Sequence, residues 1–318
     1  MFAALAASIA IAHAQVMPSP SPTPSRQALS DAWWTGPLLA PSAGTLPHGH
    51  ILVEPYLYDV VQYGAYNAHG ALKPAPHENA YGSLTYVIYG LTDRFNVGMI
   101  PVFGYTAVSN GLNSSGIGMG DWAVLAQYRL TQYRAGSWIP TTSVSVQETF
   151  PTGKYDNLGE RSSDGQGGGA YATKISLYTQ TYFWMPNGRI LRARLNFSDT
   201  FSSAALVHGA SIYGTGSDFS GSAHPGTVLT LDAAMEYSAT RKWVLANDFV
   251  YTQSGNTRLT STAGETIDSG ESHSFALAPA IEYNWSPDVG IIAGVRIFPS
   301  GVNTAASVTP AIAVNYVH

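Results

Sequence analysis

The residues best suited to catalysis in this sequence are a few isolated His, Ser and Asp side chains. His273 and Ser274 are adjacent near the start of an alternating segment, and a lipid hydrolase carried on a barrel would need such a pair with an orienting polar group. Neighbouring strand residues point to opposite faces, so these two cannot readily serve one another. The sequence has no Gly-x-Ser-x-Gly elbow and no Cys nucleophile. We therefore expect no enzyme, with the hydrolase kept as an alternative.

Cofactor and nucleic-acid chemistry find little support. His208, Asp218 and His224 share one glycine-rich stretch, but their spacing fits no standard metal site, and no cofactor is expected. Gly116-x-Gly118-x-Gly120-Asp121 is followed by a strand pattern, so no helix N-terminus is available for a phosphate. The net charge is -5 without any Lys/Arg cluster, which excludes nucleic acid as an expected partner.

The composition favours a membrane β-barrel as the element that positions these residues. Charged residues make up 11% of the 318 residues, too few to cover soluble domains, whereas hydrophobic residues make up 45%. After residue 14 no apolar run approaches the roughly 18 to 20 residues that a spanning helix needs. The remaining candidate is a chain in which apolar and polar residues alternate, as in an outer-membrane barrel.

The first 50 residues differ from the rest. Residues 1–14 end in Ala12-His13-Ala14 after an apolar stretch, which predicts a signal peptide cleaved before Gln15. Residues 15–50 comprise a Pro-rich spacer and an irregular segment with neither strand nor helix period. For residues 26–50 three hypotheses stay open: they tuck into the barrel, lie against its periplasmic rim, or form a flexible leader.

Twelve segments with period-2 hydrophobicity follow, predicting an all-β, antiparallel, up-and-down transmembrane barrel over residues 51–318. They are 51–63, 80–91, 95–107, 119–131, 138–150, 169–184, 189–200, 226–239, 242–254, 271–285, 289–300 and 305–317.

The connections alternate in length, as they do in bacterial outer-membrane barrels with short periplasmic turns and long external loops. The short ones are 92–94, 132–137, 185–188, 240–241 and 286–288, and the others are 64–79, 108–118, 151–168, 201–225, 255–270 and the brief 301–304. This pattern predicts a bacterial outer-membrane location with both termini periplasmic.

Two hairpins predict the register. A three-residue turn at 186–188 places Phe183 opposite Leu191 and Gln180 opposite Arg194, and one at 286–288 places Tyr283 opposite Ile291. Aromatic residues gather beside the short turns, which predicts an interfacial girdle. Its expected members are Tyr89, Phe95, Trp138, Phe183, Trp184, Tyr237, Trp243, Tyr283, Trp285 and Tyr316.

Three motifs in order carry a family resemblance. They are Tyr89-Gly90-Leu91-Thr92-Asp93-Arg94-Phe95, then Gly118-Met119-Gly120-Asp121 leading to Ala126-Gln127-Tyr128-Arg129, then Phe150-Pro151-Thr152-Gly153-Lys154. Together they resemble the outer-membrane transporter family named for the meta-pathway of phenol degradation, over most of residues 51–318. The resemblance implies a β-barrel that passes aromatic or other small hydrophobic molecules, and it brings no catalytic residues with it.

Alternation also predicts which polar residues face the barrel lumen. They are Asp121, Gln127, Arg129, Lys174, Tyr178, Gln180, Tyr182, Arg192, Arg194, Asn196, Asp232, Glu236, Asp248, Glu282, Asn284 and Arg296. In one hypothesis Arg192 and Arg194 face a wall with Asp232 and Glu236 across a polar constriction; in the other these charges pair and plug a narrow barrel.

The predicted function is a passive outer-membrane channel for small hydrophobic or aromatic solutes. Its expected partners are outer-membrane lipid, the small-molecule solute and the barrel-assembly machinery. A structural or surface-binding barrel without transport is the other alternative.

Overall fold

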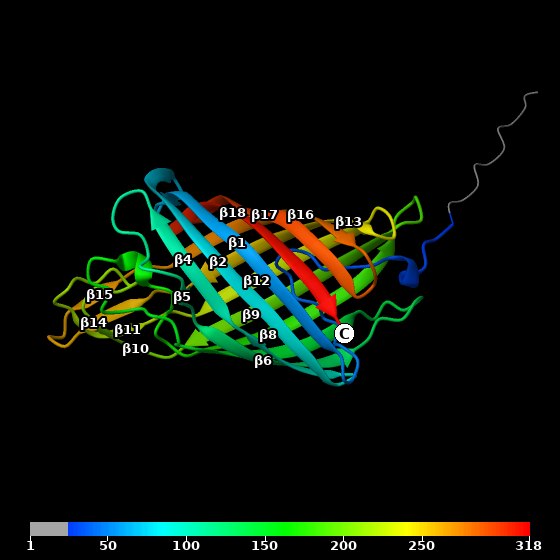
Figure 1. The fold of residues 1–318 in the computed structure, drawn as a ribbon, viewed down its shortest axis with the longest axis horizontal. Helices are drawn as coiled ribbons and strands as arrows, with labels where there is room; N and C mark the ends of the chain where they lie inside the picture. The colour runs from blue at the N-terminus through cyan, green and yellow to red at the C-terminus, as the bar shows by residue number, and fades with distance from the viewer. Residues whose placement is uncertain (1–24) are drawn as a thin grey trace, which may run out of the picture.

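The computed structural model describes residues 25–318, which form a closed antiparallel β-barrel (Figure 1). The prediction of an all-β, twelve-stranded, up-and-down barrel is confirmed. The wall consists of β1 (Ile51–Tyr66), β2 (Leu72–Thr92), β3 (Phe95–Ile100), β4 (Val102–Val108), β5 (Gly118–Met119), β6 (Trp122–Thr131), β7 (Thr141–Phe150), β8 (Ala172–Trp184), β9 (Ile190–Ser202), β12 (Val228–Ser238), β13 (Trp243–Ser254), β16 (Ser272–Asn284), β17 (Val289–Val302) and β18 (Thr304–Val317). β1 pairs with both β2 and β18, which closes the barrel.

Two barrel strands are interrupted, so fourteen segments make twelve strands. β3 and β4 form one strand broken at Pro101, and β5 and β6 form one strand broken at Gly120 and Asp121. Proline has no N–H for the ladder and is tolerated in sheets where pairing is disturbed. The two breaks lie side by side, because β3 pairs with β6 and β4 with β5.

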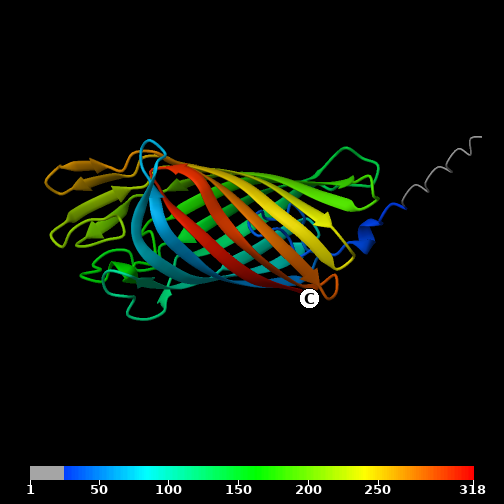
Figure 2. The same ribbon diagram turned by 90° about the horizontal axis from the view of Figure 1, so that it is seen from above.

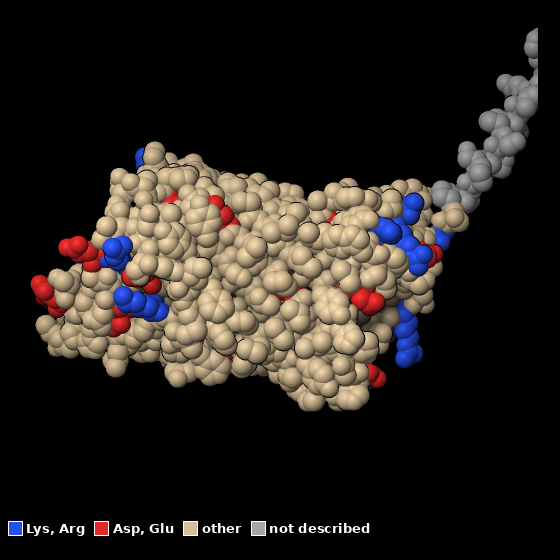
Figure 3. Space-filling view, in the orientation of Figure 1, with Lys and Arg blue, Asp and Glu red and all other residues tan. Residues whose placement is uncertain are grey.

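The predicted hairpin registers are confirmed. Phe183 pairs with Leu191, Gln180 with Arg194, and Tyr283 with Ile291. A slip of one residue would exchange the two faces of a strand, so the hydrophobic pattern agrees with the pairing that the three-residue turns predict. On the face shown in Figure 3, Lys and Arg gather at the two ends and leave the middle of the wall free of them.

The two ends of the barrel differ, as the connection lengths predicted. One end, called the short-turn end, carries the turns after Thr92, Trp184, Ser238 and Asn284; the opposite, long-loop end carries residues 109–117, 151–171, 203–227 and 255–271. The predicted external link 64–79 is too long: β1 and β2 extend past the predicted strand ends at residues 63 and 80, and residues 67–71 join them.

Two predicted loops contain regular structure that the sequence analysis missed. Segments 201–225 and 255–270 form a four-stranded antiparallel sheet of β10 (Ala205–His208), β11 (Ser220–His224), β14 (Arg258–Ser261) and β15 (Thr266–Asp268) (Figure 1). Its buried residues are small and apolar: Ala205, Val207, Ala223 and Leu259 pack on Ala170. Each strand has only three to five residues, and the two hairpins, β10–β11 and β14–β15, are joined by the β11–β14 pairing between separate loops, which no local sequence pattern predicts.

The aromatic residues at the short-turn end largely point outward. Trp243, Tyr283 and Trp285 form a continuous cluster, with ring centroids 4.7 and 5.2 Å apart. Trp184 was predicted to belong to the outward-facing girdle, and this is wrong, because its indole Nε1 donates inward to the Gln27 carbonyl. Trp138 precedes β7, which begins at Thr141 rather than at the predicted 138.

Residues 25–50, called the inner segment, enter the barrel from its short-turn end: the middle part, with buried Ala32, Leu38, Ala40 and Ala43, lies in the lumen, whereas residues 25–31 lie outside the mouth and residues 47–50 are exposed (Figure 2). Apart from the single 3-10 turn η1 (Leu29–Asp31), the inner segment has no regular structure. Of the three hypotheses for residues 26–50, the one in which they tuck into the barrel holds for the middle of the segment, whereas its two ends lie at or outside the rim of the short-turn end. The predicted signal peptide, residues 1–14, lies outside the described residues. No helix in residues 25–318 combines the length and apolar character needed to cross a bilayer.

Candidate functional site

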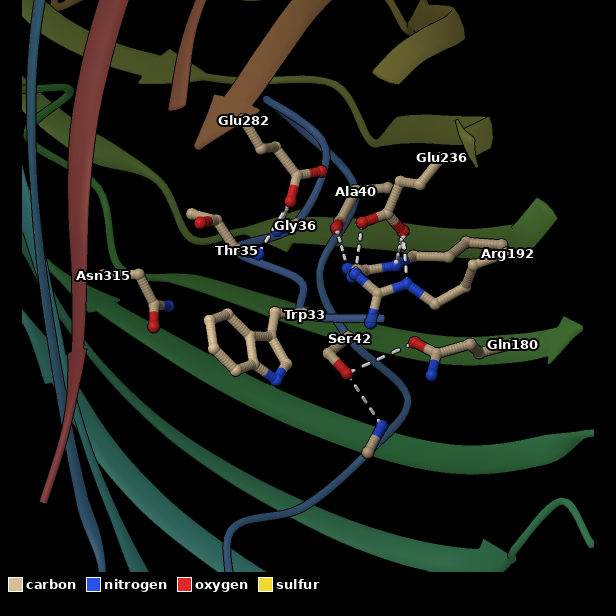
Figure 4. Close-up of polar contacts among 12 residues, drawn as sticks. Trp33, Thr35, Gly36, Ala40, Ser42, Gln180, Arg192, Glu236, Glu282 and Asn315 are labelled. Carbon is tan, nitrogen blue, oxygen red and sulfur yellow. Dashed lines mark hydrogen bonds and ion pairs between the residues drawn. The ribbon is translucent and has the colours of Figure 1, made fainter. Parts of the chain in front are cut away.

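A compact ion cluster lies on the lumen side of β9 and β12, near the short-turn end. β9 and β12 pair Arg192 with Glu236, and both side chains point inward (Figure 4). Arg192 Nε donates to Glu236 Oε2 at 2.6 Å, Arg192 Nη2 donates to the other oxygen, and Arg194 Nε lies 3.1 Å from Oε2. The Glu236 side chain is fully buried. The charges therefore pair between adjacent strands, and the hypothesis of opposed charged walls across an open constriction is wrong for these residues.

The inner segment supplies backbone N–H groups to two further carboxylates. Thr35 N and Gly36 N donate to Glu282 Oε2 at 2.7 and 3.2 Å (Figure 4). Leu39 N and Ala40 N donate to the two oxygens of Asp248 at 3.3 and 2.9 Å. A chain without secondary structure must find partners for its buried N–H groups, and the wall carboxylates provide them. Hydrogen bonds to a charged group are also stronger than those between neutral groups.

The carbonyl groups of the same segment are held by donors from β9 and β6. Arg194 Nη1 donates to the Ala40 carbonyl at 2.7 Å, and Asn196 Nδ2 donates to the Pro41 carbonyl at 2.9 Å. Gln127 Nε2 donates to the Ser42 carbonyl at 2.9 Å. Acceptors on β13 and β16 and donors on β6 and β9 thus hold the segment across the lumen.

Apolar and aromatic contacts complete the anchoring. Leu38 is buried against Ala278, Ile292 and Ala313, which belong to β16, β17 and β18. The Trp34 ring lies 4.5 Å from the Arg192 guanidinium carbon, in a cation–π arrangement. The segment is therefore fixed to the wall by both its backbone and its side chains.

A cavity of about 690 Å³ lies between the inner segment and the wall. Its apolar and aromatic lining includes Leu52, Tyr56, Tyr58, Val60, Leu84, Tyr86, Ile88 and Tyr178. From Leu52 to Val60 it follows β1 over eight residue-to-residue steps, which is about 26 Å at the usual rise of a strand. This cavity lets the barrel hold an elongated apolar or aromatic molecule beside the segment.

At the long-loop end the loop of residues 151–171 packs against β4 and the break between β5 and β6. Asp121 accepts hydrogen bonds from Gly153 N at 2.9 Å and Gly168 N at 2.6 Å, which brings the loop back over the barrel. Gln166 rests on Gly104 of β4, where a Cβ would lie 2.2 Å from Gln166 Oε1. A larger residue at 104 would therefore displace the end of the Gln166 side chain from this position.

The short 3-10 turn η2 (Ser162–Asp164) fixes the outer part of this loop. Ser115 donates to Asp164 from both its backbone N–H, at 2.7 Å, and its hydroxyl. The backbone hydrogen bond from Ser115 is the main reason that the pKa of Asp164 lies below its ordinary value. The loop therefore has a defined conformation.

The structure locates all sixteen predicted lumen residues. Buried are Gln127, Tyr178, Gln180, Arg192, Arg194, Asn196, Asp232, Glu236, Asp248, Glu282 and Asn284. Partly buried are Asp121, Arg129, Lys174, Tyr182 and Arg296. Of these sixteen, the residues that line the large cavity are Gln127, Lys174, Tyr178, Arg192, Arg194 and Arg296. Arg129 instead lines a separate space of about 340 Å³ at the short-turn end, and Asp121 holds the loop described above.

Sequence reasoning missed several cavity residues. Glu54, Tyr56 and Tyr58 lie on the inward face of β1, and Tyr86 lies on β2. The alternation in segment 51–63 already separated these positions from Leu57, which is 60% exposed, so the signal was present. Trp34 had no such signal, because the inner segment has no period.

The residues considered for catalysis do not come together. His273 is exposed and packs near Tyr251 on the outer face, whereas Ser274 is buried on the inner face. Within residues 25–318 no group of three or more His, Cys, Asp or Glu side chains could hold a metal ion.

Comparison with known proteins identifies the family. Residues 77–308 match the model of the family described as "Putative MetA-pathway of phenol degradation". The chain belongs to this family. The resemblance noted in the three sequence motifs is thereby confirmed.

The fold is that of solved outer-membrane barrels. The chain is similar to the COG4313 outer membrane channel from Pseudomonas putida F1, with a TM-score of 0.69 and 14% identity over 87% of this chain and 98% of that one. The Pseudomonas putida toluene transporter TodX also matches, with a TM-score of 0.41 and 12% identity over 90% of this chain and 95% of that one. No curated protein matches the sequence significantly.

Proposed function

We propose that this protein is a passive outer-membrane channel for small hydrophobic or aromatic solutes. The observation that carries the proposal is the tyrosine-lined cavity of about 690 Å³ between the inner segment and the wall of β1, β2 and β18. Four tyrosines offer aromatic faces, and leucine, valine and isoleucine side chains fill the spaces between them. Such a surface binds an apolar ring better than it binds a strongly hydrated solute.

Family membership and the names of similar proteins support the same function. The family description refers to phenol degradation, and the COG4313 protein is called an outer membrane channel. Solute would move down its concentration gradient, since the sequence contains no energy-coupling motif.

The proposed orientation places the short-turn end in the periplasm. The inner segment and the C-terminal residue His318 both meet that end, where His318 N donates to the Ile51 carbonyl at 2.9 Å. Short periplasmic turns and long external loops are the rule in this class of barrel. Both termini are then periplasmic, and outer-membrane lipid and the barrel-assembly machinery are the corresponding partners.

The test is solute uptake by cells that lack the protein and are complemented with matched variants. Ala311 lines the cavity, whereas Ala293 on the neighbouring strand is exposed on the outer face. Ala311→Trp should fill the passage and reduce toluene uptake to near the level of cells without the protein. Ala293→Trp adds the same side chain outside and should leave uptake intact.

Uptake that is equal with and without the wild-type protein would contradict the proposal. Equal loss in both tryptophan variants would also contradict it, provided that both fold, as judged by heat-modifiable migration in gels.

A further inference from the structure

Two cationic side chains line the cavity without an acidic partner. Lys174 of β8 and Arg296 of β17 both contribute to the lining, from opposite sides of the barrel. Within residues 25–318 the ion pairs involve other residues, and neither Lys174 nor Arg296 takes part in one. Partly buried cations are costly unless something compensates them, so these two positions need an explanation.

The inner segment explains why the wall carboxylates do not compensate them. Its N–H groups cover Glu282 and Asp248, and Glu236 is held by Arg192 and Arg194. Among acidic residues, only Glu54 lines the cavity, where it accepts a hydrogen bond from Asn315 near the short-turn end. The cavity lining therefore carries four cationic side chains and one carboxylate.

Arg296 is adjacent to a second free donor. β17 and β18 pair Arg296 with Thr309, and both residues line the cavity. Arg296 Nε and Thr309 Oγ1 are both buried, and neither forms a hydrogen bond with the protein. The Arg296 guanidinium carbon lies 5.0 Å from the centre of the Phe298 ring, so the arginine also has an aromatic neighbour.

We propose that Arg296 and Thr309 form a subsite for the carboxylate of a small aromatic acid, in a cavity whose facing wall carries the further cation Lys174. This inference rests on the proposed channel function and names the class of solute. A guanidinium presents parallel N–H donors that match the two oxygens of a carboxylate. A threonine hydroxyl adds a third donor, and the tyrosines along β1 and β2 receive the ring. The neutral part of the solute would be bound by the apolar lining and its charge by the subsite.

The experiment uses benzoate, with benzamide as a neutral molecule of similar shape and acetate as an anion without a ring. Each is supplied to proteoliposomes that contain the full-length wild-type protein, and its rate of entry is measured. Benzoate should enter faster than benzamide and acetate. Losing a hydrogen bond to a charged group costs enough to lower affinity by about tenfold or more. Arg296→Gln should therefore reduce the benzoate preference about tenfold, again relative to benzamide.

Two further variants separate binding from general effects. Thr309→Val keeps the shape and the net charge, and should lower the benzoate preference while benzamide entry is unchanged. Lys73→Gln removes one positive charge from an exposed position on β2 and should have no effect on the preference.

The outcomes are distinguishable. If benzamide enters as fast as benzoate, or if Arg296→Gln keeps the preference, the carboxylate subsite is wrong although the channel stands. If acetate enters as fast as benzoate, the aromatic part of the inference is wrong. If none of the three enters above the rate of protein-free liposomes, the proposed channel function itself fails.

Discussion

Replacing Glu236 by Gln should destabilise the barrel more than any substitution of an exposed carboxylate. Glu236 is fully buried and is the shared partner of two buried guanidiniums, Arg192 and Arg194. Removing one member of a buried ion pair costs about 3 to 5 kcal/mol, because the partner charge is left uncompensated. The glutamine carbonyl still accepts one hydrogen bond, so we expect the lower value, about 3 kcal/mol, or a change in the unfolding equilibrium of roughly a hundredfold.

The assay is reversible urea unfolding of the protein in phospholipid vesicles, followed by tryptophan fluorescence. The slope of the transition should be unchanged while its midpoint falls. Glu265→Gln, at an exposed position in the turn between β14 and β15, is the matched control and should shift the midpoint little. In a Glu236→Gln background, Arg192→Gln should cost less than it does alone, because the pair is already broken. A loss below about 1 kcal/mol, or additive effects of the two changes, would refute the inference that this cluster is a strongly coupled pair.

Two further predictions concern the long-loop end. Asp121→Asn leaves only one carbonyl oxygen to accept hydrogen bonds from the N–H groups of Gly153 and Gly168, so the loop should open more often. Tryptic cleavage after Lys154 should then be faster than in the wild-type protein. An unchanged cleavage rate would contradict the role given to Asp121. Arg258 donates a hydrogen bond to Asp268 and holds the pKa of Asp268 below its ordinary value of 3.8. The pair therefore contributes fully to the stability of the β14–β15 hairpin above pH 3.8. This stability is lost as the pH falls through the lower pKa of the folded state. An NMR titration of the Asp268 carboxyl should show Arg258→Gln moving its pKa upward, and no movement would show that the pair is not formed.

The barrel wall was predictable because its strands and turns are determined by residues that are close together in the sequence. Each strand repeats a contrast between lipid-facing and lumen-facing positions, and the turn at Pro186, Asn187 and Gly188 sets the count between two strands. Gly188 has a φ of +79°, the left-handed conformation that this turn requires. Even the mixed polar set on the inner faces of β9, β12 and β16 could be read from alternation. What alternation cannot give is which of these side chains contact each other.

The partners of the inner segment depend on tertiary structure instead. Thr35 and Glu282, which are hydrogen-bonded, are 247 positions apart in the sequence, and nothing local links them. An unpaired backbone has no characteristic period, so residues 26–50 look the same whether they enter a barrel or lie outside it. The sheet of β10, β11, β14 and β15 escaped prediction for a related reason: its two short hairpins lie in different loops, and both their joining through β11 and β14 and their packing on Ala170 depend on tertiary structure.

The inner segment changes the electrostatics of the lumen as well as its width. An empty barrel of this sequence would expose Glu282 and Asp248 together with the arginines of β9, and its interior would offer both charges to a solute. Because the segment binds those carboxylates through its own N–H groups, it leaves the cationic lining facing the cavity. A neutral, irregular stretch of chain with few charges can therefore give the passage a preferred sign of charge. It does so through backbone dipoles, which requires the wall to carry acidic residues where the segment passes and basic residues where the solute passes.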